Sequence, residues 1–152
     1  MKFKVTFVLV ILLSFHSVAQ ETSSKIIKQT IEDFFKGFHA RDSVVIKRTL
    51  GENFTLQTIR KDTMGSASLK TTSSSMFFQN IAGIPSEVDF EEKLLSFTID
   101  SDGLMAHVWT PYEFWFGGKF SHCGVNSFHL MNTNSGWRII SILDTRYVKG
   151  CK

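Results

Sequence analysis

The stretch from Leu104 to Tyr147 constrains this chain more than any other. It contains three long runs rich in aromatic and β-branched residues, separated by Gly117-Gly118 and by a polar break from Asn132 to Gly136. Runs of this kind, joined by short glycine or asparagine turns, predict a three-stranded antiparallel meander. Strands of about a dozen residues exceed the usual five or six, so we expect the sheet to bend strongly and to need cover on one face.

The first residues predict a secretory signal peptide that does not belong to the fold. Lys2 and Lys4 flank the start of an apolar run from Val5 to Phe15, and Ser17-Val18-Ala19 has the small residues of a cleavage site. The apolar run is short for a membrane span, so an uncleaved anchor is the less favoured alternative. We expect residues 1–19 to be removed, residues 20–152 to form one domain with no stable membrane span, and the protein to be periplasmic or secreted.

The charge balance argues against a nucleic-acid partner. The whole chain has 17 Lys and Arg against 14 Asp and Glu. Loss of Lys2 and Lys4 with the signal peptide leaves 15 against 14. Nucleic-acid recognition needs a basic face, and the sequence contains no basic run. We therefore expect no binding to nucleic acid.

Three helices are predicted before the central stretch, and the first is the longest. It covers Ser24 to Ala40, where one face is apolar: Ile27, Ile31, Phe34, Phe35 and Phe38. Asp42 is placed to cap a second, shorter helix that Gly51 ends. The expected apolar side of that helix is Val44, Val45 and Leu50. Ser73 to Ala82 predicts a third helix stopped by Gly83, with a partly ordered loop as the alternative.

Two further strands complete the expected fold. Asn53 to Ile59 alternates along a short strand, and Glu87 to Asp100 leads to a turn at Ser101-Asp102-Gly103. Residues from Arg60 to Lys70 are polar and predict a loop. Segregated helices and a mainly antiparallel sheet indicate an α+β fold. Three helices packed on the concave face of a strongly bent sheet would give a cone-shaped barrel with one open end.

Several motifs in this order resemble those of the nuclear transport factor 2 like superfamily. They are His107-x-Trp109-Thr-Pro-Tyr-Glu-Phe, Phe120-x-His122-x-Gly124, Gly136-Trp137-x-Ile139 and Asp144-Thr-Arg146. The resemblance covers residues 24–151 and extends to small exported proteins of the lumazine-binding subgroup. It implies a cone of the SnoaL and ketosteroid isomerase type, a pocket and frequent homodimers. It implies no single activity, because this fold hosts unrelated functions.

Aligning the hairpins from their turns gathers polar side chains on one face of the sheet. With turns at Gly117-Gly118 and Asn134, Glu113 lies opposite His122, and His122 lies opposite Arg146. The resulting polar-aromatic face holds His107, Trp109, Glu113, His122, Asn126, Asp144 and Arg146. Tyr112 falls on the apolar face. A one-residue bulge would exchange the faces locally, and we expect one at Pro111, which has no N–H to donate.

Two interpretations of this face stay open. In the preferred one, it is a sheet-to-sheet dimer surface with a salt-bridged row formed by Glu113, His122 and Arg146. In the other, it lines the open mouth of the cone, where His122 acts as general base or acid and Asp144 or Glu113 orients it. The ligand-binding residues would then be Trp109, Tyr112, Asn126 and Arg146. Tyr112 stands where isomerase-type relatives have a pocket carboxylate, which argues against catalysis.

The remaining chemistry-bearing residues predict neither a metal site nor a cofactor. His129 alternates to the opposite face from His122, so the histidines do not converge. Cys123 and Cys151 leave two alternatives, a disulfide of the kind exported proteins permit, or one strand cysteine and one free tail cysteine. The predicted register puts Cys123 opposite Thr145, six residues short of Cys151. A disulfide would therefore require the tail to double back.

These observations predict an exported, single-domain homodimer without a cofactor, which binds a small, partly apolar molecule or a partner protein. The alternative is a cofactor-free lyase, isomerase or hydrolase that uses His122 with Asp144 or Glu113. A third interpretation is a purely structural dimerisation module. The three differ in whether acid–base groups lie inside a water-poor pocket.

Overall fold

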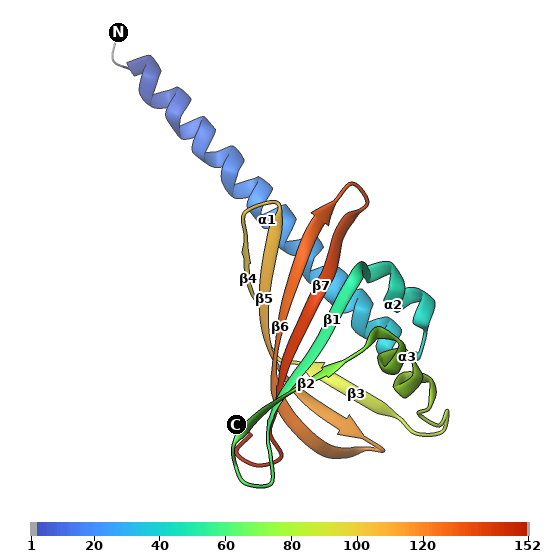
Figure 1. Cartoon of the computed structure of the whole chain (residues 1–152). Coiled ribbons are helices and arrows are strands. Elements are labelled where there is room, and N and C mark those ends of the chain that lie inside the picture. Colours follow the sequence, from blue (N-terminus) through green and yellow to red (C-terminus); the bar gives the residue numbers. More distant parts are fainter. Residues whose placement is uncertain (1–2, 152) are drawn as a thin grey trace.

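The structure is a computed structural model that describes the backbone of residues 3–151 and the side chains of residues 21–151. The predicted signal peptide lies outside the residues whose side chains are described, and it stays a prediction. The described chain forms these elements (Figure 1): α1 Phe3–His39, α2 Ser43–Thr49, β1 Leu50–Lys61, β2 Ala67–Thr72, α3 Ser74–Ala82, β3 Phe90–Leu94, β4 Thr98–Ser101, β5 Met105–Phe116, β6 Lys119–Thr133 and β7 Gly136–Arg146.

A seven-stranded sheet forms the body of the molecule. Its order is β2-β1-β7-β6-β5-β3, and β4 also pairs with β5. Neighbouring strands are antiparallel except β1 and β7, which are parallel. Figure 1 shows the β1–β2 and β5–β6 hairpins diverging at the end of the sheet where the C-terminus lies. The predicted α+β cone is confirmed, with an open wide end and a sheet that does not close on itself.

The core lies between α1 and the concave face of the meander. The predicted apolar stripe of α1 is buried there at Ile27, Ile31, Phe34 and Phe35, and Phe38 packs beside it. The sheet contributes alternate residues of β5, β6 and β7: Ala106, Val108, Phe128, Leu130, Trp137, Ile139 and Ile142. Alternation in the strands and a spacing of three and four in the helix produce one shared apolar interior.

Side-chain caps begin the two shorter helices as predicted. The Asp42 carboxylate accepts hydrogen bonds from the backbone N–H groups of Val44 and Val45 at 2.9 and 3.0 Å. Ser73 Oγ accepts one from the N–H of Met76 at 3.2 Å. Each bond satisfies an N–H group that has no partner within its own helix. The structure therefore has a helix at α3 and not the alternative, a partly ordered loop.

The predicted apolar side of α2 was wrong. Ile46 is its fully buried residue, whereas Val44 is exposed and Leu50 already begins β1. The cause is a close crossing at Gly37 of α1, where a Cβ would lie 2.9 Å from the backbone nitrogen of Ile46. The two helices approach backbone to backbone and turn Ile46 into the core. Gly51 therefore lies within the strand and does not end the helix.

Strand β2 occupies part of the segment that the sequence predicted to be a loop. It pairs with β1 from Lys61↔Ala67 to Leu56↔Thr72. The strand lies at the edge of the sheet and is mostly exposed, so it has no apolar alternation to reveal it. Its Lys70 is typical of edge strands, where charge discourages pairing with other chains.

The predicted strand from Glu87 to Asp100 is interrupted opposite Pro111. β3 pairs with the half of β5 that follows this proline, and β4 pairs with the half that precedes it. Pro111 has no N–H to donate, and its carbonyl accepts a hydrogen bond from Leu95 N at 2.9 Å. The bulge predicted at Pro111 was wrong, because β5 and β6 pair without a shift on both sides of this proline; only the β3–β4 edge is interrupted opposite it.

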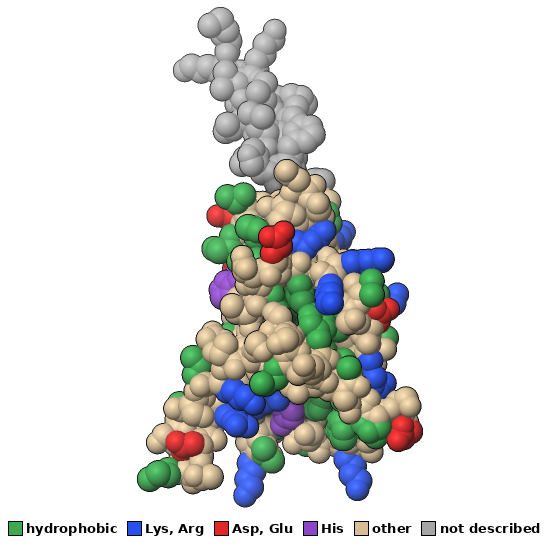
Figure 2. Space-filling view, turned by 45° about the vertical axis from the view of Figure 1, so that its right-hand side comes forward, with side chains coloured by type: hydrophobic (Ala, Val, Ile, Leu, Met, Phe, Trp, Pro, Cys, Tyr) green, Lys and Arg blue, Asp and Glu red, His purple; other side chains and the backbone are tan. Residues whose placement is uncertain are grey.

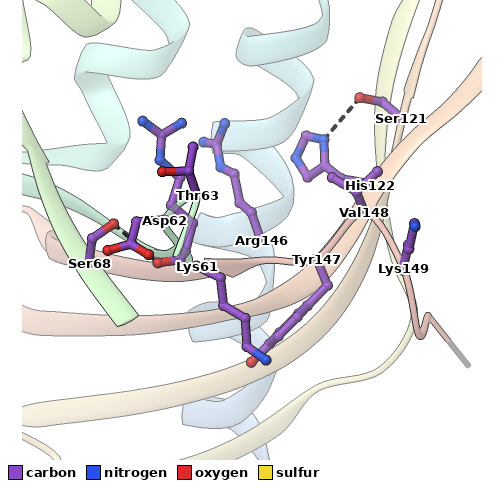
Figure 3. Close-up of a pocket in the computed structure, with 11 residues that line it drawn as sticks. Lys61, Asp62, Thr63, Ser68, Ser121, His122, Arg146, Tyr147, Val148 and Lys149 are labelled. Carbon is purple, nitrogen blue, oxygen red and sulfur yellow. Dashed lines mark hydrogen bonds between the residues drawn. The ribbon is translucent and has the colours of Figure 1, made fainter. Parts of the chain in front are cut away.

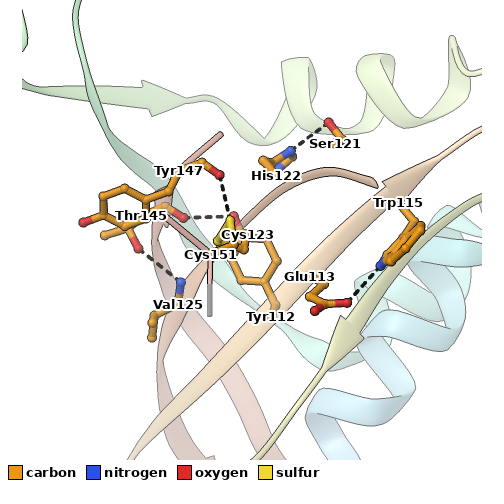
Figure 4. Close-up of a disulfide and its surroundings, with 10 residues drawn as sticks. All are labelled: Tyr112, Glu113, Trp115, Ser121, His122, Cys123, Val125, Thr145, Tyr147 and Cys151. Carbon is orange, nitrogen blue, oxygen red and sulfur yellow. Dashed lines mark hydrogen bonds between the residues drawn. A yellow bond between two sulfur atoms is a disulfide. The ribbon is translucent and has the colours of Figure 1, made fainter. Parts of the chain in front are cut away.

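Cys123 and Cys151 form a disulfide (Figure 4). Cys123 pairs with Tyr147, not with Thr145 as the turn positions predicted, through backbone hydrogen bonds of 3.0 and 2.8 Å. Tyr147 is close enough in sequence to Cys151 for one tight reversal of the tail, which brings the two Cα atoms to 5.9 Å. Of the two alternatives for the cysteines, the structure has the disulfide.

Candidate ligand-binding site

A one-residue bulge in β6 decides which side chains share the helix-facing side of the sheet. Phe114 of β5 pairs with His122, and the next pair toward the turn skips Ser121. The predicted pairing of His122 with Glu113 was wrong by this one residue. His122 and the alternate residues after it therefore share a face with Phe114, and Glu113 lies on the opposite face.

This register brings five of the predicted site residues together at the wide end: Tyr112, His122, Asn126, Asp144 and Arg146. Tyr112 was predicted on the apolar face, but it pairs with Gly124 and its ring enters this group. The structure does not bring Glu113 or Trp109 there. Glu113 accepts a hydrogen bond from Trp115 Nε1 at 3.1 Å on the other face, and Trp109 is 46% exposed.

A cavity of about 290 Å³ opens at the wide end of the cone. Its apolar wall consists of Phe38, Leu56, Phe77, Ile81, Ile84 and Phe114. Its polar lining consists of Thr58, Arg60, Lys70, Thr72, Asn80, Glu92, His122 and Arg146. A deeper space of about 60 Å³ shares part of this wall and reaches Asn126 and Asp144. A groove of about 850 Å³ lies at the mouth (Figure 3), and it shares Arg60, His122 and Arg146 with the cavity.

Asp144 is the centre of a polar network at the base of the cavity. Its carboxylate accepts hydrogen bonds from Thr58 Oγ1, from Tyr112 Oη at 3.2 Å and from Arg146 Nε at 2.8 Å. Thr58 is also its register partner on the parallel strand β1. Burial raises the pKa of Tyr112, and the nearby carboxylates raise it further, so the phenol stays protonated. The network provides the buried Asp144 carboxylate with three side-chain donors.

Glu92 is a pocket acid that the sequence analysis missed. Its Oε1 accepts a hydrogen bond from Asn126 Nδ2 at 2.7 Å, and its backbone N–H donates to His39 Nε2 at 2.9 Å. Burial raises the pKa of Glu92 to about 7; the Asn126 bond lowers it, the Asp144 charge raises it and Arg146 lowers it. Glu92 is therefore divided between protonated and ionised forms near neutral pH.

His122 lies at the boundary between the cavity and the outer groove. Its ring stacks on Phe114 with centroids 4.9 Å apart, and Nδ1 lies 3.1 Å from Ser121 Oγ. Burial lowers the pKa of His122, the Arg146 charge lowers it further, and Asp144 opposes both. The ring is therefore neutral near pH 7. Among the described residues, neither Asp144 nor Glu113 hydrogen-bonds to it, so the predicted orienting pair is not formed.

Two other histidines, His107 and His129, lie outside this site. His107 and His129 are cross-strand neighbours on the outer face, with ring centroids 5.2 Å apart. Within the described part of the chain, no group of three or more His, Cys, Asp or Glu side chains is arranged to hold a metal ion. Over the same described residues, we find no helix with the length and apolar character of a membrane span.

Comparison with known proteins identifies the fold. No family model and no curated protein sequence matches this chain. A solved structure described as NTF2-like with a cystatin-like fold, from Novosphingobium aromaticivorans, is 12% identical, with a TM-score of 0.67 over 90% of this chain and 89% of that one. An NTF2-like protein from Cytophaga hutchinsonii is 9% identical, with a TM-score of 0.64 over 82% and 98%. A second Novosphingobium aromaticivorans protein, provisionally assigned as a scytalone dehydratase, is 8% identical, with a TM-score of 0.67 over 90% and 93%.

The fold is that of the nuclear transport factor 2 like proteins. The resemblance read from the sequence motifs is confirmed at this level. At such low identities the similarity shows a shared fold and assigns no activity. The lumazine-binding subgroup stays a prediction.

The cavity has more acid–base groups around it than the sequence analysis assigned to it. Tyr112 was predicted to stand where a pocket carboxylate would lie; the structure brings two other acids, Glu92 and Asp144, to the deeper space. The pattern Phe90-x-Glu92-x-Leu94 was the available signal: it places one acid among apolar residues on the inner face of a strand. Thr58 and Arg60 were also missed, because they belong to β1, whose partners could not be assigned from its own sequence.

Proposed function

We propose that this chain is an exported domain that binds a small, partly apolar molecule in the wide-end cavity. The observation that carries the proposal is the cavity of about 290 Å³, in which an apolar wall faces a few converging polar groups. That combination is typical of small-molecule sites, where apolar area gives affinity and a few polar groups fix orientation. Of the proposed ligand-binding residues, Arg146 lines this cavity and Asn126 lines the deeper space, whereas Tyr112 Oη already donates to Asp144.

Export is supported by two independent features. The first residues have the basic start, apolar run and small-residue cleavage site of a signal peptide. The Cys123–Cys151 disulfide is a second, since such bonds persist mainly in oxidising compartments. Together they favour a periplasmic or secreted protein.

Native mass spectrometry of the mature protein, purified from the exported fraction of its own host, tests the proposal. We expect the protein mass plus the mass of one small molecule per chain. Ile84→Trp should fill the cavity and remove the added mass, whereas Val44→Trp, on the exposed side of α2, should retain it. Retention by both variants would place the molecule elsewhere and overturn the proposal.

The outer face of the sheet supports a homodimer as part of this proposal. Met105, Trp109 and Met131 are all large apolar residues that are 44–54% exposed on this face. Exposed apolar groups clustered on one surface are typical of protein–protein contacts. We propose a second copy of the chain as the partner. If the cavity bound no ligand, the protein would be a purely structural dimerisation module.

A cofactor-free lyase, isomerase or hydrolase is the second candidate function. The observation that favours it is Glu92, whose pKa is raised to about 7 by burial beside Asp144. A group with a pKa near the working pH is suited to accept and return a proton. His122 with Asp144 stays part of this proposal, but Glu113 faces away, and Glu92 takes its place as the nearby acid.

A further inference from the structure

We infer that the ligand of the cavity is an amphipathic organic anion, whose single acidic group lies between Arg60 and Arg146 while its flat apolar body enters the cone. This inference rests on the proposed binding function and specifies the chemical class of the ligand. It is carried by the placement of charged residues around the mouth and by the apolar wall behind them.

The central observation is a pair of like charges on neighbouring strands. Arg60 of β1 and Arg146 of β7 are register partners, and both line the cavity and the outer groove. Like charges directly opposite each other in a sheet are destabilising. Arg146 uses its Nε to bind Asp144, and among the described residues no carboxylate pairs with Arg60. An anion bridging the two guanidinium groups would remove the repulsion and satisfy their remaining N–H donors.

Other cationic side chains add positive charge to the same end of the molecule. Lys70 lines the cavity, and Lys61 and Lys149 line the groove. Figure 2 shows Lys and Arg side chains gathered beside a histidine near this end. One acid of the groove, Asp62, accepts hydrogen bonds from the N–H groups of Met64 and Ser66 in its own turn. The mouth therefore has an excess of positive charge that draws in anions.

The interior sets the orientation of such a ligand. Phe38, Phe77 and Phe114 supply aromatic surface inside the cavity, which suits a flat apolar body. Asp144 lines the deeper space, Glu92 lines both that space and the cavity, and their carboxylates would repel an acidic group placed beside them. The acidic group must therefore stay at the rim, and the apolar part must point inward.

Two fluorescent probes that differ in one group test the inference. The anion 8-anilinonaphthalene-1-sulfonate and neutral N-phenyl-1-naphthylamine share the same ring system, and only the first carries a sulfonate. Titrations of the oxidised mature protein would give the affinity of each for the wild type and for Arg60→Gln. Arg48→Gln is the matched control, because Arg48 is exposed on α2 and lines neither the cavity nor the groove.

We expect one anion per chain, bound about tenfold more tightly than the neutral probe, with an affinity that falls as salt is added. Arg60→Gln should weaken the affinity for the anion by about fivefold to tenfold. It should change the affinity for the neutral probe by no more than about twofold. Arg48→Gln should change neither affinity. Equal binding of both probes to the wild type, or equal weakening of both by Arg60→Gln, would overturn the inference while leaving the cavity a binding site. Binding of neither probe, or binding that Ile84→Trp does not reduce, would overturn the proposed function and this inference with it.

Discussion

Asn126 donates a hydrogen bond of 2.7 Å to the carboxylate of Glu92 and so joins the middle of the meander to the edge strand β3. Asn126 is buried, and its amide favours the ionised form of the acid. Burial acts in the opposite direction and dominates, which places the pKa of Glu92 at about 7. The wide end of the cone therefore contains a carboxyl group whose charge changes near neutral pH.

The raised pKa of Glu92 predicts that the stability of the protein falls as pH rises. Between its ordinary pKa of 4.5 and its folded pKa of about 7, the folded state binds more protons than the unfolded state. The free energy of unfolding should therefore fall by about 3 kcal/mol across that window. Urea denaturation of the wild type and Glu92→Gln from acid to neutral pH checks this, because the difference between them removes the contributions of the histidines.

If the free energies of unfolding of the wild type and Glu92→Gln differed by the same amount at every pH, the raised pKa of Glu92 would be contradicted. Asn126→Ala provides a second check, read by carbon NMR of the Glu92 carboxyl group. Because this variant removes a bond that lowers the pKa, the titration of Glu92 should move to higher pH.

Gly124 is a position where any side chain should destabilise the fold. A Cβ there would lie 1.8 Å from the backbone oxygen of Thr145 and 3.0 Å from the ring of Tyr112. We expect Gly124→Ala to lower the free energy of unfolding by about 2–3 kcal/mol, because the strands must separate. Gly83→Ala is the matched control, since its right-handed helical backbone accepts a side chain at a cost below about 1 kcal/mol. Equal effects in chemical denaturation would show that the crowding at Gly124 is unimportant.

Reduction of the disulfide should destabilise the protein and release its tail. The bond joins residues 28 apart, and closing a loop of that size contributes about 3 kcal/mol through the unfolded state. Cys123→Ala combined with Cys151→Ala should show the same loss by denaturation, and the amides of Cys123 and Tyr147 should exchange faster with solvent. Free thiols in the untreated, exported protein would contradict the pairing.

If the cavity is catalytic, Glu92 and Glu113 should behave differently once a substrate is identified. Glu92→Gln should lower kcat by about 10²–10⁴-fold, as loss of an acid–base group does. Glu113→Gln should leave kcat unchanged, because Glu113 lies on the opposite face and binds Trp115. His122→Ala tests the remaining role: full turnover by this variant on a genuine substrate would exclude His122 as the general base.

The outer face predicts the effect of one substitution on assembly. Trp109→Glu should weaken a homodimer by at least about tenfold, because it places a charge on the same sheet face as the exposed Met105 and Met131. Met64→Glu, in the β1–β2 turn where Met64 is 90% exposed, should leave the dimer intact. Size-exclusion chromatography with light scattering distinguishes the two. A wild type that is already monomeric would remove the outer face as a self-association surface.

The sequence predicted those elements whose own residues carry a periodic signal. The stripe of α1 and the long runs of the meander each have one apolar face, so their positions follow from spacing alone. β2 has no such signal because it is an exposed edge strand, and β3 was merged with β4 because the break lies opposite Pro111 on another strand. Elements such as β2, β3 and β4, whose limits depend on the neighbouring strands, therefore could not be predicted from their own sequence.

The candidate site depended on register, which a single residue can change. Ser121 has nothing unusual in its type, yet its insertion places His122 beside Phe114 and turns Glu113 away. A second irregularity, between His129 and Leu130, contributes to moving Cys123 opposite Tyr147 and makes the disulfide reachable. The Gly117-Gly118 turn was predicted correctly, but the second turn is shifted by one residue to Asn134-Ser135, and turn positions could not reveal extra residues farther along the strands.

The bulge at Ser121 also separates two parts of the molecule that selection can alter independently. Beyond it, toward β7, the register is fixed by the buried core, so the inward set from His122 to Leu130 is preserved. Before it, the hairpin tip needs only a turn that suits Gly117-Gly118. The unpaired Ser121 accommodates the one-residue difference in register between the tip and the rest of the hairpin. A lineage could therefore shorten or rebuild this tip, and so change the rim that a ligand meets first, while the interior chemistry is inherited unchanged.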